Sequence, residues 1–454
     1  MKQMPIDDNI LNGVHGFTDE AHYVQPEEPV RTKLEWFQDQ KLGLMMHFGP
    51  YAQLGIMESW GLSDYDAHWS REGIDWAKGG KEFREKYFAL NRSFYPICMQ
   101  PQQWAETAAD SGFKYLIFTT KHHDGFCLWD TQQTDYKTTA PSCPFHKNPN
   151  ADIVKSVFRA FRAKGLGIGA YFSKPDWHSR YYWTPGMEHS EETWRNPSYD
   201  VYEYPWIWEQ FVQFTHRQML ELIGEYGKVD ILWLDGGQVN PKIGLDIRLH
   251  EIVPKLREIQ PELIVADRTV GGAYENYVTP ELTIPEKPMN IPWESCLTMG
   301  SSFAYRYDDT YKSAEKIVHL LIEIICKGGN LALNIAPEPT GRLPRPALEQ
   351  LKSLGSWMKT YGEAVYGTRI CAPYKTSQAA FVQKNGVIYA FVLAQEGVFA
   401  EKILLQVSDI RRVSAVADGK EIPFEAGVQG ITIDRQNLPS DSAVPSVSVL
   451  RLER

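Results

Sequence analysis

One short stretch joins a buried-strand pattern to a group that can do chemistry. Residues 229–234 form a mostly apolar run, and Asp235, Gly236 and Gly237 follow it directly. Runs of this length that are rich in branched residues and closed by glycine predict a strand buried on both faces. In parallel α/β barrels, catalytic groups collect at the carboxyl end of such strands. Asp235 is therefore a candidate catalytic carboxylate, and the alternative is that it only caps a helix or turns the chain.

Other polar and aromatic side chains also lie where predicted strands end. They are His47, His122, His123, Tyr171 and Arg268, and the carboxylates available to join them are Glu58, Glu281, Glu286 and Glu294. Two carboxylates that flank a sugar bond are the requirement for glycoside hydrolysis. Histidine and aspartate ligands would instead suit metal-assisted hydrolysis. A third possibility is that the groups only bind a sugar or a peptide.

The metal hypothesis depends on the ligand-rich run His122-His123-Asp124. Adjacent residues on a strand point to opposite faces, so the two histidines are not expected to share one ion. The helical H-E-x-x-H spacing is absent as well. We therefore expect no metal and no other cofactor, and each histidine taken singly is also compatible with a buried, hydrogen-bonded core residue.

Helices and strands alternate along the first 365 residues. Strands are predicted at 42–49, 115–120, 166–173, 229–235, 263–268 and 328–335, helices at 33–40, 101–111, 152–164, 206–226, 247–259, 309–326 and 346–361, and loops at 50–95 and 278–307. This alternation indicates a parallel sheet. Five strands before residue 270, with no G-x-G-x-x-G after the first, favour a closed barrel over a doubly wound sheet.

The pattern changes after residue 366. Short β-branched segments at 379–383, 387–393, 402–407 and 447–452 alternate with the turn signals Asn385-Gly386 and Asp418-Gly419. We therefore predict an α/β protein with an N-terminal arm at residues 1–30, a (β/α)8-like, TIM-type barrel at 31–365 and a C-terminal antiparallel β-sandwich at 366–454.

Composition narrows the function classes. The net charge of −10 leaves no basic field for nucleic acid. Residues 1–12 lack an apolar signal region and no apolar run reaches 18 residues, so no membrane association is expected. We expect a soluble protein, cytoplasmic, or periplasmic or secreted if a signal peptide has been removed. The six cysteines have no C-x-x-C spacing and indicate neither a zinc site nor a disulfide framework. Homo-oligomerisation stays open.

An ordered set of motifs resembles the α-L-fucosidases of glycoside hydrolase family 29. The motifs are GLMMHFG at 43–49, KHHDGF at 121–126, YFS at 171–173, WLDG at 233–236, DR at 267–268, PWE at 292–294, KGGNLALN at 327–334 and GEAVYGT at 362–368. Each motif alone is modest, but their common order over residues 33–369 is highly specific.

The resemblance implies a retaining, exo-acting hydrolase of terminal α-L-fucose on fucosylated oligosaccharides or glycoconjugates. By motif position, Asp235 would be the nucleophile and Trp233 would wall the sugar. His47, His122, His123 and Tyr171 would bind the fucose hydroxyls, and Arg268 would keep Asp235 ionised. Glu58 and Trp60 resemble a Glu-Trp pair of the family, although Ser59 separates them here.

Two carboxylates compete for the role of acid/base. In a retaining enzyme this group lies about 5–5.5 Å from the nucleophile, with a raised pKa. Glu281 lies in a Thr-Pro-Glu loop after Arg268, and Glu294 follows Trp293, which would desolvate it. We favour Glu281, and Glu294 would then make a structural or sugar hydrogen bond.

The sequence departs from the family pattern at Phe48, at Phe172 and in the stretch 302–305. These changes affect the expected linkage preference more than the chemistry. Two alternatives remain at this stage: a related retaining glycosidase of neighbouring sugar specificity, or a carbohydrate-binding barrel without activity.

Overall fold

The computed structural model describes residues 17–63, 67–71, 74–77, 80–187, 195–441 and 443–454. Residues 1–16 of the predicted N-terminal arm lie outside these ranges. Within them, no helix is both long enough and apolar enough to cross a membrane.

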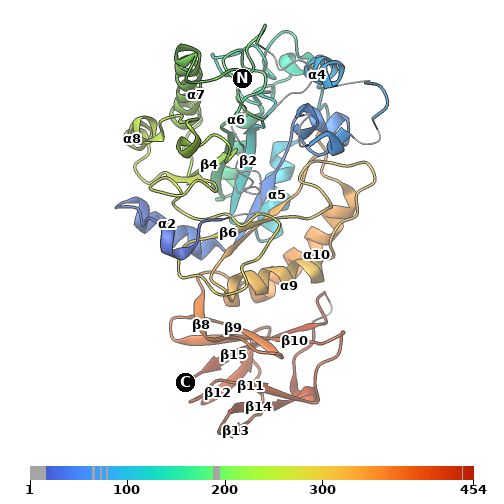
Figure 1. The fold of residues 1–454 in the computed structure, drawn as a ribbon. Coiled ribbons are helices and arrows are strands. Elements are labelled where there is room, and N and C mark those ends of the chain that lie inside the picture. The colour runs from blue at the N-terminus through green and yellow to red at the C-terminus, as the bar shows by residue number, and fades with distance from the viewer. Residues whose placement is uncertain (1–16, 64–66, 72–73, 78–79, 188–194, 442) are drawn as a thin grey trace.

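Seven parallel strands form the central sheet (Figure 1). They are β1 (Leu42–Met46), β2 (Tyr115–Lys121), β3 (Gly167–Ser173), β4 (Ile231–Asp235), β5 (Ile264–Asp267), β6 (Glu294–Thr298) and β7 (Asn330–Asn334). Their order is β5-β4-β3-β2-β1-β7-β6, and every pair is parallel. The predicted TIM-type α/β fold is therefore confirmed.

An irregular segment, residues 275–282, links the two ends of this sheet. On one side Asn276 donates its backbone N–H to the carbonyl of Val265, which lies in β5. On the other side the segment forms parallel bridges to β6, which pair Val278 with Trp293 and Glu281 with Cys296. The segment therefore takes the place of a further strand and carries Glu281 at its carboxyl end.

Helices accompany the strands as the alternation predicted. Their bounds are α2 (Val30–Gln40), α4 (Gly80–Phe88), α5 (Pro101–Asp110), α6 (Ile153–Ala163), α7 (Pro205–Glu225), α8 (Leu249–Ile259), α9 (Ala314–Ile325) and α10 (Arg345–Tyr361). Short 3-10 helices lie at Glu20–His22, Pro50–Gln53, Trp60–Leu62, His68–Arg71, Ala89–Arg92, Pro144–Lys147, Pro241–Ile243, Gly362–Ala364 and Arg435–Asn437.

Local sequence signals explain where several of the helices start. Asp152 and Ser313 cap α6 and α9 through their side chains, and α5, α7 and α10 carry proline in the first turn.

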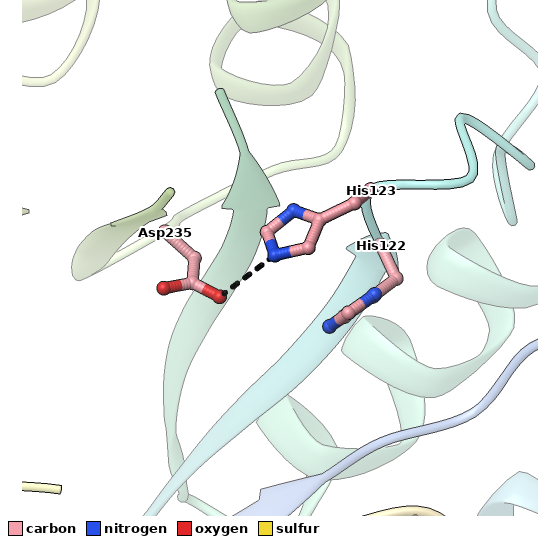
Figure 2. A group of neighbouring side chains, drawn as sticks. All are labelled: His122, His123 and Asp235. Carbon is pink, nitrogen blue, oxygen red and sulfur yellow. Dashed lines mark ion pairs between the residues drawn. The ribbon is translucent and has the colours of Figure 1, made fainter. Parts of the chain in front are cut away.

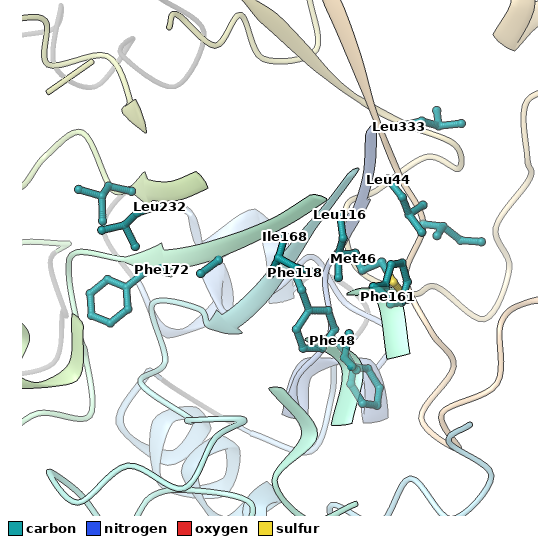
Figure 3. Close-up of a cluster of buried hydrophobic side chains, with 14 of the residues drawn as sticks. Leu44, Met46, Phe48, Leu116, Phe118, Phe161, Ile168, Phe172, Leu232 and Leu333 are labelled. Carbon is teal, nitrogen blue, oxygen red and sulfur yellow. The ribbon is translucent and has the colours of Figure 1, made fainter. Parts of the chain in front are cut away.

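Alternate strand residues face two separate apolar layers. Leu44, Met46, Leu116, Phe118 and Ile168 belong to the larger core cluster, part of which is drawn in Figure 3. Their neighbours along the strands belong to a second cluster, made of Met45, Tyr115, Ile117, Tyr171, Ile231, Trp233, Ile264, Ala266, Cys296 and Ala332. The period of two along each strand produces this division. Residues of α2 join the second cluster, where Phe37 stacks on Tyr277 with ring centroids 4.3 Å apart.

Three local predictions were wrong. The region 278–307 was predicted as loop but contains β6, because the strand sequence Glu-Ser-Cys-Leu-Thr lacks a continuous apolar run. The predicted loop 50–95 contains α4, together with four of the short 3-10 helices. Residues 309–313 precede α9 rather than belonging to it, since Ser313 is the residue that caps the helix.

The C-terminal region forms two antiparallel sheets, drawn at the bottom of Figure 1. Its strands are β8 (Arg369–Lys375), β9 (Ala379–Lys384), β10 (Val387–Leu393), β11 (Lys402–Leu405), β12 (Arg412–Ala415), β13 (Glu425–Gly427), β14 (Gly430–Asp434) and β15 (Val447–Glu453). The orders are β12-β15-β10-β9-β8 and β11-β14-β13. One apolar cluster contains residues of both sheets, such as Phe381 and Ile433, so the predicted β-sandwich is observed. Domain boundaries at residues 30 and 365 stay predictions.

Two helical glycines test the packing of the outer helices. A methyl group on Gly355 of α10 would overlap the backbone carbonyl of Asp110 at the end of α5, whereas the nearest atom to such a group on Gly224 of α7 is a side-chain carbon 3.8 Å away. We expect Gly355→Ala to lower the free energy of unfolding by about 1–3 kcal/mol. Gly224→Ala should raise it by up to about 1 kcal/mol. Denaturant melts of both variants would measure this, and equal effects of the two would contradict the close helix contact.

Candidate active site

One pocket at the carboxyl ends of the strands gathers nearly all the predicted site residues. Its lining includes His47, Glu58, Trp60, His122, His123, Tyr171, Trp233, Asp235, Arg268 and Glu281. Met45, Arg195, Gly236, Gly237, Gln238, Thr269, Cys296 and Phe303 complete it. Of the candidate residues named from the sequence, Glu286 and Glu294 do not line this pocket.

Arg268 joins the two carboxylates of the pocket. Its Nη1 lies 2.5 Å from Asp235 Oδ1, and its Nη2 lies 2.5 Å from Glu281 Oε2. A third hydrogen bond, from Nε to Thr279 Oγ1 at 3.0 Å, fixes the plane of the guanidinium. A planar fork of donors is the geometry in which arginine binds carboxylates best. The two carboxyl groups are therefore held side by side on one rigid cation.

Asp235 is an ionised carboxylate at the end of β4. Gly236 follows it at φ +91°, a left-handed conformation that lets the chain turn away at once. Tyr171 donates its hydroxyl to Asp235 Oδ2 at 2.5 Å, and His123 Nε2 lies 3.8 Å from the same oxygen. Burial opposes ionisation, but the charge of Arg268, with His123 and the Tyr171 hydrogen bond, outweighs it and holds the pKa of Asp235 well below its ordinary value.

The neighbours of His47 determine which of its ring nitrogens donates a hydrogen bond and which accepts one. Asn334, at the end of β7, donates its amide N–H to the carbonyl of Phe303 at 2.7 Å. Its amide oxygen therefore faces His47 Nδ1, 2.7 Å away, so Nδ1 carries the hydrogen and donates it. Burial lowers the pKa of His47 to about 4, which keeps the ring neutral. Its Nε2 is then an acceptor for a ligand hydroxyl.

His122 and His123 follow the end of β2 and lie side by side (Figure 2), with ring centroids 4.3 Å apart. The expectation that they point to opposite faces was wrong, because β2 ends at Lys121 and the strand alternation ends with it. Trp177 holds this turn by donating its backbone N–H to the carbonyl of His123 at 2.7 Å. Tyr87 holds it through a 2.7 Å hydrogen bond to Asp124.

The same two rings and Asp235 are the one group among the described residues that meets the distance requirement for a metal site. Their ligand atoms all lie within 4.8 Å of one another. Both rings have a lowered pKa because of burial, so both are neutral. However, Arg268 already binds Asp235, and a divalent ion would be placed against that guanidinium. The charge arrangement suits a neutral polar ligand better than a cation.

Glu58 adds a third carboxyl group to the pocket wall. It is 3% exposed, and its Oε1 accepts the backbone N–H of Ala304 at 2.6 Å. Burial, reinforced by the charges of Glu281 and Asp235, raises the pKa of Glu58 to about 8. At neutral pH this group is mainly an uncharged acid, which can donate as well as accept a hydrogen bond. Its backbone has φ +30°, an uncommon conformation for a glutamate.

Aromatic rings form the walls between these polar groups. Trp233 stacks on Tyr171 with ring centroids 5.1 Å apart. The Arg268 guanidinium lies 4.2 Å from the centre of the Trp233 ring. Trp60 meets His123 edge to face at 5.0 Å, and the Arg195 guanidinium lies 4.4 Å from the Trp60 ring. The pocket thus combines flat apolar surfaces with a few fixed polar groups, as sites for small polar molecules do.

Glu294 lies below the pocket rather than in it. The residue is fully buried at the start of β6, where Tyr115 and Tyr277 donate their hydroxyls to its carboxyl oxygens. Burial raises its pKa to about 7, against the lowering effect of the tyrosine hydrogen bonds. This position agrees with the structural hydrogen-bonding role, which was the alternative to the acid/base role for Glu294.

Two polar residues that hydrogen-bond to the histidines were not recognised as site residues in the sequence: Ser59, which contacts His122, and Asn334, which contacts His47. Asn334 ends a predicted strand, so the signal that found His47 and Asp235 would have found it. Arg195 and Gln238 also line the pocket, but they lie on irregular segments with no periodic pattern. Cys296 and Phe303 were missed because their region was predicted as loop.

The arrangement can support displacement at a sugar carbon. It offers an ionised carboxylate, a second carboxyl on the same arginine, a neutral buried acid and neutral imidazoles. Two adjacent carboxyl groups with aromatic walls are the equipment of a retaining glycosidase.

Comparison with known proteins agrees with this chemistry. A family model described as alpha-L-fucosidase matches residues 15–363. An alpha-L-fucosidase of Dictyostelium discoideum is 24% identical over 92% of both chains. The plasma alpha-L-fucosidase of Pongo abelii is 28% identical over 73% of this chain and 69% of its own. The solved structure of alpha-L-fucosidase isoenzyme 1 from Paenibacillus thiaminolyticus superposes with a TM-score of 0.76 at 27% identity, covering 93% of this chain and 98% of that one. The resemblance inferred from the motifs is confirmed.

The buried carboxyl of Glu294 should make stability depend on pH. Its pKa is 4.5 in an exposed chain and about 7 in the fold, so between these values the folded protein binds a proton that the unfolded chain has lost. Stability is therefore lost as pH rises from about 4.5 to about 7, by on the order of 3 kcal/mol. Glu294→Gln should remove this loss, while Glu258→Gln, at an exposed glutamate, should not. Denaturant melts at pH 5 and pH 8 measure it, and equal pH dependence in wild type and Glu294→Gln would refute the assignment.

Proposed function

The chain belongs to the alpha-L-fucosidase family of glycoside hydrolases, and on that premise we propose that it is a retaining, exo-acting enzyme that removes terminal α-L-fucose from fucosylated oligosaccharides or glycoconjugates. In this proposal Asp235 is the nucleophile and Glu281 is the acid/base. The observation that carries it is the Arg268 guanidinium, which binds both carboxylates at 2.5 Å.

In the first step, an oxygen of Asp235 attacks the anomeric carbon of fucose. The bond from that carbon to the leaving oxygen breaks, and Glu281 gives its proton to this oxygen. The products are a fucosyl ester on Asp235 and a free acceptor sugar or alcohol. Ionised Asp235, with a pKa well below its ordinary value, is suited to this attack.

In the second step, Glu281 takes a proton from water as the water oxygen attacks the anomeric carbon. The ester bond breaks and Asp235 leaves as a carboxylate, so fucose is released with its original α configuration.

Negative charge passes between the two carboxylates during this cycle. Asp235 is charged and Glu281 protonated before the first step, whereas Asp235 is esterified and Glu281 charged after it. Arg268 contacts both groups, so it can remain the counter-ion of whichever carboxylate is ionised. A fixed cation that needs no rearrangement is an efficient form of electrostatic stabilisation.

The histidines, Tyr171, Glu58 and the two tryptophans are proposed to bind the fucose. Neutral imidazoles and an uncharged acid can exchange hydrogen bonds with sugar hydroxyls without burying further charge. Trp60 and Trp233 offer apolar surface to the sugar's C–H groups. A pocket with this lining accommodates a terminal sugar, which supports exo action.

Glu281 is preferred to Glu294 as acid/base on two grounds. Glu281 lines the pocket and its side chain is 15% exposed, whereas Glu294 is fully buried and outside the lining. Glu281 also shares Arg268 with Asp235, and that sharing favours the short carboxyl separation of retaining enzymes, about 5–5.5 Å, over the longer inverting one.

Removal of the nucleophile should abolish turnover. We expect Asp235→Ala to lower kcat by on the order of 10⁴ or more, because it removes the ionised carboxylate that attacks the anomeric carbon. Hydrolysis of an aryl α-L-fucoside measures the effect, and NMR of the first product anomer tests retention. Near-normal turnover by Asp235→Ala, or release of β-L-fucose by the wild type, would refute the mechanism.

The two candidate acids can be separated by a matched pair of isosteric variants. Glu281→Gln should lower kcat/KM on fucosyl oligosaccharides by about 10²–10⁴-fold, and less on aryl fucosides whose leaving group needs little protonation. Glu294→Gln should keep activity within a few-fold, since its carboxyl does not reach the pocket. The reverse result would assign the role to Glu294.

A panel of α1,2-, α1,3/4- and α1,6-linked fucosyl oligosaccharides would identify the linkage. No hydrolysis of any member, with fucose still bound, would indicate a carbohydrate-binding barrel. If fucose were not bound either, a neighbouring sugar specificity would replace the proposal.

A further inference from the structure

Ser59 places a buried hydroxyl against a ligand-facing histidine. Its Oγ lies 2.5 Å from Nδ1 of His122, and the two residues are 0% and 4% exposed. Ser59 lies between Glu58 and Trp60 in the chain, and both of these residues line the pocket. The serine between them contacts a histidine that lines the same pocket.

The Ser59 side chain does not cap the short helix that follows it, although its place in the chain would suggest so. Ser59 is the N-cap of the short helix Trp60–Leu62, a position where serine normally accepts a hydrogen bond from the first turn. Here the side chain makes no capping bond, and only the backbone carbonyl accepts the N–H of Leu62, at 3.0 Å. The hydroxyl is directed to His122 instead.

The direction of this hydrogen bond follows from the available partners. Within the described part of the chain, the Ser59 hydroxyl has one hydrogen-bond partner, His122 Nδ1. A buried hydroxyl hydrogen is satisfied only if it points at an acceptor, so Ser59 donates and Nδ1 accepts. The neutral ring then carries its hydrogen on Nε2. Burial and the neighbouring rings of His123 and His47 lower the pKa of His122, so the ring stays neutral.

His122 then has the opposite polarity to His47. Asn334 makes His47 Nδ1 a donor and leaves its Nε2 as an acceptor, whereas Ser59 makes His122 Nδ1 an acceptor and leaves an N–H on Nε2. The two rings are neighbours in the pocket, with centroids 5.9 Å apart. A single sugar hydroxyl, or two adjacent ones, can donate to one ring and accept from the other.

We propose that Ser59 is a positioning residue that holds His122 in its Nε2–H tautomer, so that the pocket offers a hydrogen-bond donor beside the acceptor of His47. The identification of the bound hydroxyls as those of fucose rests on the proposed function. The tautomer itself does not, because it is a property of the free enzyme.

NMR of the wild-type protein labelled with ¹⁵N-histidine tests the tautomer without turnover. The His122 signals are identified by their absence from a His122→Asn sample. We expect a neutral ring with hydrogen on Nε2 in the wild type and in Ser59→Thr, and a loss of this single tautomer in Ser59→Ala. A wild-type His122 with its hydrogen on Nδ1 would overturn the proposal.

Kinetics then test whether the tautomer matters. Ser59→Ala should lower kcat/KM on aryl and oligosaccharide fucosides alike by about tenfold, the effect of one lost hydrogen bond, and should weaken inhibition by free fucose. Ser59→Thr should restore most of the loss. Ser70→Ala is the matched control, since Ser70 is a buried serine nearby in the chain that donates its hydroxyl to the carbonyl of Ala67.

Two outcomes would overturn the positioning role. One is unchanged activity in Ser59→Ala despite an altered tautomer. The other is an equal loss in Ser59→Thr although its tautomer is that of the wild type. Absence of fucosidase activity in the wild type would contradict the proposed function and leave the NMR result valid.

Discussion

The pocket depends on one interaction, the fork of Arg268 between Asp235 and Glu281. Burying two carboxyl groups in one apolar-walled site is costly unless a cation compensates them. Arg268 does so with both ends of a rigid plane, and Thr279 fixes that plane through Nε. The same contact that makes the buried charges tolerable also sets the two carboxylates side by side. Stability of the site and its chemistry therefore have a common cause.

This contact requires the irregular part of the barrel. Arg268 follows β5, and Glu281 lies at the end of segment 275–282, which bonds to β5 on one side and β6 on the other. The segment bonds to β6 by a parallel bridge between Glu281 and Cys296. Cys296 donates its N–H to the Pro280 carbonyl, and Leu282 donates its N–H to the Cys296 carbonyl, at 3.1 Å each. These two bonds support Glu281, the proposed acid/base, from its own backbone, while β4 supports Asp235, the proposed nucleophile.

Sequence patterns predicted most strands that carry site residues. They missed β6 and the residues that reach the pocket through tertiary contacts. The strands that carry His47, Tyr171, Asp235 and Arg268 were identified because their apolar runs end in polar groups, and the motifs then supplied Glu281. β6 was missed because Glu294, Ser295 and Thr298 interrupt its apolar character. The pairing of His122 with His123 was misjudged because the argument applied strand alternation to them, whereas β2 ends at Lys121 and neither histidine lies on it. Ser59 and Arg195 act through tertiary contacts that no local period encodes.

The buried polar residues around the pocket explain how it binds a neutral sugar at all. A cavity lined by three carboxyl groups and three imidazoles would have no defined charge at neutral pH if each group titrated as it does in water. Burial keeps His47, His122 and His123 neutral, and it keeps Glu58 mainly uncharged at neutral pH. In the proposed mechanism, only Asp235 and Glu281, the two carboxyl groups on Arg268, change charge. Asn334 then assigns hydrogen-bond direction at His47 through a second partner, the Phe303 carbonyl. Because His47 has a fixed hydrogen-bond polarity, the pocket can discriminate among sugars by hydroxyl geometry, while in the proposed cycle negative charge only moves between Asp235 and Glu281.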